Sequence, residues 1–239
     1  FISRLAQGQL EPIKFYNFTE LKNFLSYLPA NQQRKIEKKK QRKANNGQEL
    51  NISYNIAAHS PIKVNEDFIY IGEAYYATYR TETRTSTSYV NGKAVTTTTT
   101  VQVFDGYQYT HAFIAKFDKN GNLIWDQTFP MWLSQKPMTV RRFIHVADQQ
   151  QNNLKLVYAN GNRITSKVFD FDGNVLSDKQ SDQIETSAEN DKTRLSYAEI
   201  IHWYDNYFLS YGIQRIINRK DKDVERKRTV FFFNKIKLD

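Results

Sequence analysis

Histidine and lysine side chains recur at one position of a repeated pattern, and such side chains can bind metal ions or transfer protons. The stretches IKVNED, IHVADQ and IHWYDN, which begin at residues 62, 144 and 201, align residue for residue. Lys63, His145 and His202 occupy the second position, where they could line a channel. A catalytic zinc site usually has three protein ligands, and no third histidine shares this position. The pattern therefore favours a repeated structural position over a metal centre, and we expect neither a metal nor another cofactor.

Two short acidic stretches have some of the residues of a calcium loop. The sequences DKNGN and DFDGN begin at Asp118 and Asp170 and contain Gly121 and Gly173. An EF-hand loop places its glycine sixth and a glutamate twelfth, whereas the glycine here is fourth. This spacing suits a hairpin turn in which glycine adopts a positive φ angle. We therefore predict turns at both places.

Sequence patterns typical of common enzyme classes are missing. The chain has no cysteine, no Gly-x-Ser-x-Gly elbow, no phosphate-binding glycine loop and no His-Glu-x-x-His. Trp125, Trp132 and Trp203 could form a sugar-stacking surface, but aromatic residues in a strand-rich protein are more often part of the core. The sequence favours a non-enzymatic protein and leaves an enzyme open.

The positive net charge of +9 comes from two short segments. Residues 34–43 contain seven basic residues and one glutamate, and residues 218–228 contain six basic and three acidic residues. These segments account for the whole net charge, so the rest of the chain is neutral. A neutral body disfavours binding along a nucleic acid, which needs an extended basic surface. No apolar run approaches the length of about 20 residues that a transmembrane helix needs.

The chain contains an internal repeat. Gly121 in AKFDKNGNLIWD aligns with Gly173 in SKVFDFDGNVLSD, and Gly8 in SRLAQGQLEPIK aligns with both after one deletion. Each stretch of the IHVADQ type precedes an apolar run, and the third unit closes with RTVFFFNKIKLD. The unit is predicted to be four strands joined by hairpins. Tandem units of this kind are typical of β-propellers.

The pattern KFDKNGNLIWDQTF resembles the repeat of bacterial β-propeller proteins of the secreted or surface type. The resemblance implies an all-β fold, with residues 1–239 forming a single partial propeller of about three and a half four-stranded antiparallel blades. Residues 1–18 would be a half blade, followed by blades at 60–130, 140–180 and 197–239. We then expect the chain to be the C-terminal part of a longer propeller. The third unit lacks the Gly-Asn turn, and an open or barrel-like all-β domain is the alternative.

A helical insertion is predicted at residues 19–50, with helices at about 19–46. Leu21, Phe24, Leu25 and Leu28 have helical spacing after a possible cap at Thr19, and Pro29 suits the start of a second helix. The second helix would carry the basic residues Arg34, Lys35, Lys38, Lys39, Lys40, Arg42 and Lys43. It is either a solvated helix or a tether to an anionic surface.

A long protruding β-hairpin is predicted at residues 79–104. Asn91-Gly92 favours a two-residue type I′ turn, and pairing outward from it sets Val90 opposite Lys93 and Tyr79 opposite Phe104. A two-stranded ribbon is marginally stable alone, so we expect it to contact protein: a neighbouring loop, a second copy of the chain or a partner. The candidate contact residues are Tyr79, Tyr89, Asn91, Gly92 and Phe104.

The sequence therefore predicts a non-enzymatic bacterial propeller that serves as a binding or scaffolding surface. One alternative is a carbohydrate-active or carbohydrate-binding propeller with its site at the central channel, where Lys63, His145 and His202 would lie. Another is a tether that binds anionic surfaces through the basic helix. The resemblance further implies export to the periplasm or cell envelope.

Overall fold

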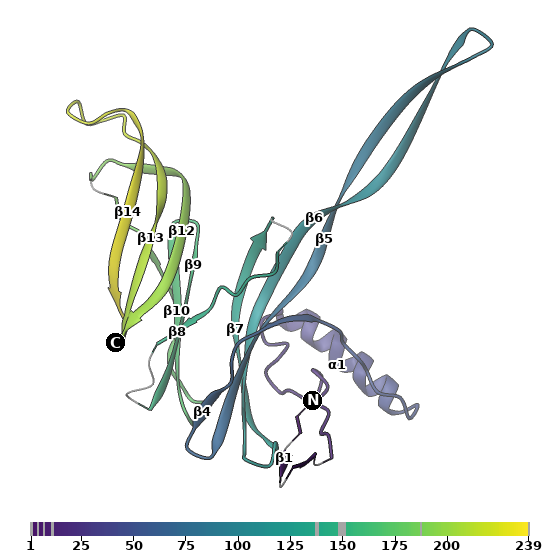
Figure 1. The fold of residues 1–239 in the computed structure, drawn as a ribbon, viewed down its shortest axis with the longest axis vertical. Helices are drawn as coiled ribbons and strands as arrows, with labels where there is room; N and C mark the ends of the chain where they lie inside the picture. The colour runs from purple at the N-terminus through teal and green to yellow at the C-terminus, as the bar shows by residue number, and fades with distance from the viewer. Residues whose placement is uncertain are drawn as a thin grey trace.

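The computed structural model describes residues 2–3, 5–6, 8–10, 12–136, 139–147, 152–186 and 188–238. The described chain consists mostly of antiparallel strands (Figure 1), which confirms the predicted all-β class. One helix lies in this part of the chain, α1 (Ala30–Ala44), beside the first large sheet. No helix in the described ranges is long and apolar enough to cross a membrane.

Three antiparallel sheets follow one another along the chain. The first contains β3 (Asn55–Ala58), β4 (Ile62–Val64), β5 (Asp67–Val90), β6 (Lys93–Phe117) and β7 (Leu123–Gln135), and both β3 and β4 pair with β5. The second contains β8 (His145–Val146), β9 (Asn153–Asn160), β10 (Arg163–Asp170) and β11 (Val175–Gln183). The third contains β12 (Lys192–Tyr204), β13 (Tyr207–Ile217) and β14 (Lys227–Lys237). A short hairpin of β1 (Leu5–Ala6) and β2 (Gln9–Leu10) lies near the N-terminus.

The sheets pack face to face through apolar side chains. Ile71 and Ile114 of the first sheet and Leu154 and Leu156 of the second are fully buried in one core. A smaller core between the second and third sheets contains Val157, Ile200 and Phe208. The other face of the first sheet is covered by the segment before α1, through Leu21 and Phe24. In the second sheet, Leu154 and Leu156 point toward the first sheet and Val157 toward the third, as the two-residue period of a strand requires.

The two acidic stretches form the same turn, as predicted. Asp118 Oδ1 accepts the backbone N–H groups of Asn120 and Asn122, both at 2.8 Å, and Asp170 accepts those of Asp172 and Asn174 in the same way. Gly121 and Gly173 adopt φ angles of 75° and 86°, which glycine tolerates without steric cost. Each carboxylate is thus used as a hydrogen-bond acceptor within its own turn.

These turns make the stability of the protein sensitive to acid. Hydrogen bonds from Asn122 and Asn174 hold the pKa of Asp118 and Asp170 below the usual range. A carboxyl whose pKa is lower in the folded state stabilises the protein above its unfolded pKa of about 3.9 and loses this effect as the pH falls through the folded pKa. The urea midpoint of the protein should therefore drop between pH 4 and pH 2. In an Asp118→Asn, Asp170→Asn double variant this drop should be smaller; an equal drop would contradict the assignment.

The predicted helix over residues 19–28 is wrong, because this segment is a series of turns. Its backbone groups bond to the first sheet: Lys22 N and Asn23 N donate to the buried carboxylate of Asp126 at 2.9 and 2.6 Å. Thr128 Oγ1 donates to Asn23 O at 2.6 Å. Leu21 and Phe24 are still buried in the core, so the apolar spacing indicated burial correctly but not a helix. The second helix is confirmed as α1, which starts directly after Pro29.

Candidate functional site

The distal part of β5 and β6 forms a ribbon, residues 79–104, that projects away from the stacked sheets (Figure 1). Its register is the predicted one, with Tyr79 opposite Phe104 and Val90 opposite Lys93. Asn91 and Gly92 adopt φ angles of 50° and 75°, as a type I′ turn requires. Every residue from 83 to 100 is exposed. At about 3.3 Å per residue, each arm of the ribbon spans about 40 Å.

The base of the ribbon is fixed to the core by a ladder of aromatic rings. The ring of Phe104 lies 6.1 Å from that of Tyr79 and 5.1 Å from that of Tyr107. Tyr107 contacts Tyr75 at 5.2 Å, and Tyr75 stacks on the fully buried Tyr109 at 5.1 Å. Contacts of this kind favour defined ring orientations, so the ribbon leaves the sheet in a defined direction.

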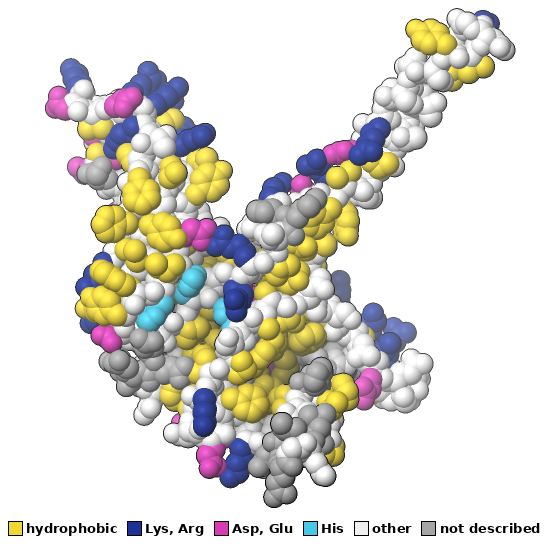
Figure 2. All heavy atoms as spheres, in the orientation of Figure 1, with side chains coloured by type: hydrophobic (Ala, Val, Ile, Leu, Met, Phe, Trp, Pro, Cys, Tyr) yellow, Lys and Arg dark blue, Asp and Glu magenta, His cyan; other side chains and the backbone are white. Residues whose placement is uncertain are grey.

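The shaft and the tip of the ribbon differ in chemistry. On one face of the shaft, Thr83, Thr85 and Thr87 lie opposite Thr100, Thr98 and Thr96. The side chains of Thr87 and Thr96 share a hydrogen bond of 3.3 Å. The tip is apolar: Tyr89 is 77% exposed, Val90 54% and Val95 45%. Figure 2 shows these hydrophobic atoms at the far end of the arm. The tip residues Val90 and Val95 were not among the predicted contact residues, although they flank the predicted turn.

A polar cluster lies where the first and second sheets are joined. Glu73 of β5 is fully buried, and its carboxylate accepts a hydrogen bond from His59 Nε2 at 2.7 Å. It also accepts the backbone N–H groups of Phe143 and Ile144 at 2.9 and 2.8 Å. Glu73 therefore fixes the segment that leads into β8.

Arg141 extends this cluster to the third sheet. Its guanidinium binds the carboxylate of Glu199 on β12 through two nitrogens, one of them at 2.9 Å, and this pairing raises the pKa of Arg141. The Tyr109 hydroxyl donates to Arg141 O at 2.7 Å, and burial raises the pKa of Tyr109 to about 12. Burial also lowers the pKa of His145 beside them. Figure 2 shows histidine, basic and acidic side chains together in the hollow between the two arms.

The structure brings two of the three predicted channel residues, His145 and His202, to one space and places Lys63 elsewhere. His145 lies between Ile144 and Val146, which pack in the core with the first sheet, so its side chain points toward the third sheet. His202 pairs with Phe208, which packs against the second sheet, so both histidines point into the space between these two sheets. His145 thus faces the sheet that follows its own, whereas His202 faces the sheet that precedes its own. The sequence alignment of β8 with β12 therefore differs from the structural repeat by one residue.

Lys63 does not join the two histidines. It lies between Ile62 and Val64, which pack toward the second sheet, so its side chain points to the opposite face of the first sheet. In the described part of the chain, no three His, Cys, Asp or Glu side chains lie close enough to hold a metal ion. His202 Nε2 instead lies 2.9 Å from the carbonyl oxygen of Asp205.

The sequence analysis missed the residues that hold this cluster together, His59, Glu73 and Arg141. One signal was present. Glu73 is the only charged residue in the apolar run FIYIGEAYYATY, and a charge inside a buried strand needs hydrogen-bond partners. Its partners are His59, 14 residues earlier, and the backbone of Phe143 and Ile144, about 70 residues further along, and no local pattern reveals them.

The basic residues of α1 form an exposed face, because no residue of this helix is buried. Lys40 and Lys43 are partly used within the fold, donating to Thr19 O at 2.7 Å and to Glu49 O at 3.5 Å. The other predicted basic residues, Arg34, Lys35, Lys38, Lys39 and Arg42, are exposed. Most of the predicted cationic surface is therefore available to solvent.

Comparison with known proteins gives no relative from which a function could be transferred. No protein-family model matches the chain, and no curated protein and no solved structure is similar to it.

Proposed function

We propose that this chain is part of a bacterial, exported β-propeller repeat protein and that it is a non-enzymatic binding scaffold. Two observations support the propeller arrangement: the sheets are successive antiparallel meanders, and they stack face to face. In this arrangement β4, β8 and β12 are the inner strands. The polar cluster around Glu73 and Arg141 then holds neighbouring blades in place.

The ribbon carries the proposed binding function. A chain that only needed a stable sheet would end β5 and β6 near Thr78, because the residues beyond bury almost no surface. The aromatic ladder holds the base, the threonine-rich shaft provides reach, and the tip offers Tyr89, Val90 and Val95. Val90 and Val95 lie on one face of the ribbon and Tyr89 on the other, and an exposed tyrosine is a typical anchor for a protein interface. We infer that the ribbon tip binds a pocket on a partner protein.

Photo-crosslinking from the tip tests this proposal. A photoreactive phenylalanine analogue at position 89 is expected to give one discrete protein adduct in the native host cell, because Tyr89 would be buried in the partner. The same analogue at Tyr197 on the third sheet is the matched control for an exposed tyrosine. A Tyr89→Ser, Val90→Ser, Val95→Ser variant should weaken binding to the identified partner at least tenfold, as loss of an anchor does.

Shortening the ribbon separates binding from stability. Replacing residues 81–102 by an Asn-Gly turn should leave the circular dichroism spectrum of the sheets and the thermal midpoint almost unchanged, since little surface is buried there. The adduct partner should no longer bind. If no adduct forms, or if the shortened protein binds as well as the intact one, the ribbon is not the binding site.

A further inference from the structure

The third sheet ends in an open strand edge. In the first two sheets a fourth strand covers the third: β7 pairs with β6, and β11 pairs with β10. The third sheet has the order β12-β13-β14, and no strand of the described residues pairs with the outer side of β14. An uncovered edge of this kind is a template for another strand. The run Val230–Phe233 in β14 has high strand propensity and contains neither a charge nor a proline.

The backbone of β14 shows which groups face this open side. Leu238 N donates to Asn206 O and Asn218 N donates to Arg226 O, each at 3.0 Å, so the even-numbered residues of β14 bond to β13 at both ends. The register between these ends has no shift. In an antiparallel pair alternate residues point their N–H and C=O groups to opposite sides. Phe231, Phe233 and Lys235 therefore present theirs to the open edge.

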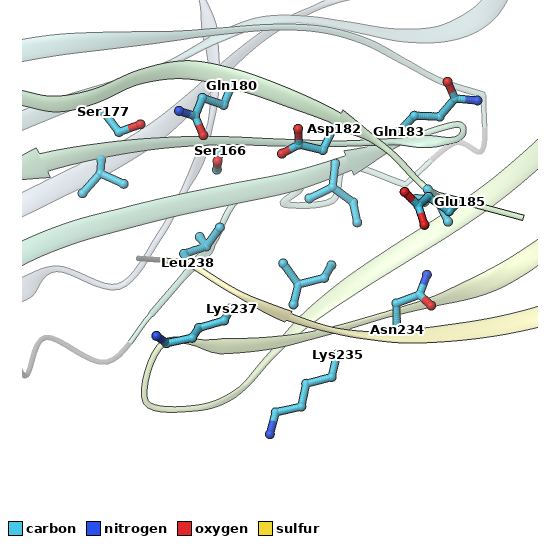
Figure 3. Close-up of a pocket in the computed structure, with 14 residues that line it drawn as sticks. Ser166, Ser177, Gln180, Asp182, Gln183, Glu185, Asn234, Lys235, Lys237 and Leu238 are labelled. Atoms are coloured by element: carbon cyan, nitrogen blue, oxygen red, sulfur yellow. The ribbon is translucent and has the colours of Figure 1, made fainter.

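A cavity lies beside this edge, where a fourth strand would pack. It has a volume of about 580 Å³ and is lined by β10, β11, the two residues that follow β11, and the end of β14. Figure 3 shows Ser177, Gln180 and Asp182 of β11 on one side and Asn234 of β14 on the other. β11 and β14 thus line two sides of one slot, and we call this cavity the slot.

The side chains around the slot determine what kind of strand fits. Residues that point into the slot would meet Ser177, Gln180 and Asp182, with Glu185 at the end, which favours polar and cationic side chains. Residues on the opposite face would lie beside Phe231 and Phe233, which are each 68% exposed. Cross-strand neighbours of exposed aromatic residues are favourable when they are apolar. The matching strand alternates polar or cationic residues with apolar ones.

We propose that the outer edge of β14 is a strand-addition site, filled by an extended segment of a partner polypeptide with this alternation. Main-chain hydrogen bonds to Phe231, Phe233 and Lys235 would supply the affinity, and the slot and the two phenylalanines would supply the specificity. This site is separate from the ribbon, so the failure of one proposal leaves the other intact.

A synthetic peptide tests the site directly. The probe is fluorescein-labelled Lys-Val-Gln-Phe-Lys-Val-Ser-Val-Lys, which has the required alternation, and its binding to the intact chain is followed by fluorescence anisotropy. We expect a Kd in the micromolar range. Hydrogen exchange should slow at the amides of Phe231, Phe233 and Lys235 when the peptide is bound. In antiparallel pairing the apolar peptide residues lie opposite Phe231 and Phe233 and donate their N–H groups to β14. A peptide with proline in place of the valine that follows its central lysine should therefore bind at least tenfold more weakly.

Variants of the protein distinguish backbone pairing from simple hydrophobic contact. Phe233→Pro removes one outward N–H, and proline is tolerated on edge strands where that group faces solvent. This variant should weaken binding at least tenfold, whereas Phe233→Ala, which keeps the N–H, should weaken it less. Asp182→Lys should also weaken binding of this cationic peptide.

Three outcomes of the peptide experiments would overturn the proposal. These are equal binding by the Phe233→Pro and Phe233→Ala variants, slowed exchange at β7, β11 or the ribbon in place of β14, and no binding at millimolar peptide. Protection of the β14 amides in a dimer without peptide would identify a second copy as the occupant and overturn the partner-strand version. The protein with the shortened ribbon should bind the peptide as the intact chain does.

Discussion

The Glu73→Ala variant is expected to lose about 4 kcal/mol of unfolding free energy, a large part of the 5–15 kcal/mol typical of a domain. Glu73 is fully buried, and its carboxylate accepts hydrogen bonds from His59 and from the backbone of Phe143 and Ile144. Alanine would leave these donors buried without an acceptor, and each unsatisfied group costs about 1–3 kcal/mol. Urea unfolding at pH 7, followed by tryptophan fluorescence, measures the loss.

Two further variants show whether the acceptor is responsible. Glu73→Gln keeps one acceptor oxygen in nearly the same volume and should lose about 2 kcal/mol. Glu82→Gln removes a carboxylate from the solvent-exposed ion pairs with Arg80 and Arg84 and should leave the stability almost unchanged. A Glu73→Ala loss as small as that of Glu82→Gln would mean that Glu73 does not anchor the segment before β8.

The Gly212→Ala variant is expected to lose about 3 kcal/mol and to disturb the third sheet. Gly212 is the central residue of β13, between its partners Ala198 and Phe232. A Cβ atom there would overlap the carbonyl oxygen of Tyr197 and approach Ala198 Cα at 3.1 Å. These are backbone atoms that cannot rotate away, so β12 and β13 would have to separate, and overpacking of this kind costs about 1–3 kcal/mol or more. Urea unfolding and hydrogen exchange of β12 and β13 amides measure the effect.

A second glycine variant provides the matched comparison. Gly161 lies in the turn between β9 and β10 with a φ angle of 61°, and a Cβ atom there would meet nothing within 4 Å. Gly161→Ala should therefore cost only the conformational penalty of about 1–2 kcal/mol. If Gly212→Ala were the milder of the two, the close approach of Tyr197 to Gly212 would not limit the packing of this sheet.

Local sequence predicted the features that depend only on neighbouring residues. Asn91-Gly92 determined the turn and register of a ribbon of more than twenty residues, because a two-residue hairpin leaves one way to pair the arms. Asp118 and Asp170 determined their turns in the same way, since their carboxylates bond to amides two and four residues away. The all-β class followed from aromatic and β-branched runs between such turns.

Helical spacing at residues 19–28 was misleading for a reason that lies outside the segment. The carboxylate of Asp126 binds the backbone amides of Lys22 and Asn23, and Thr128 binds the carbonyl oxygen of Asn23. These side chains belong to β7, about a hundred residues further along the chain. When side chains of a sheet bind the backbone N–H and C=O groups of a segment, these groups no longer need the hydrogen bonds of a helix.

By itself the sequence determined the strands, the turns, the ribbon register and the second helix, because each depends on interactions within a few residues. Only the tertiary structure decided the face on which His145, His202 and Lys63 lie, the burial of Glu73 against the segment before β8, and the open edge of β14. A shift of one residue in a strand turns every side chain to the other face. Which face is buried depends on the sheet that packs against it, and that sheet is formed by distant residues.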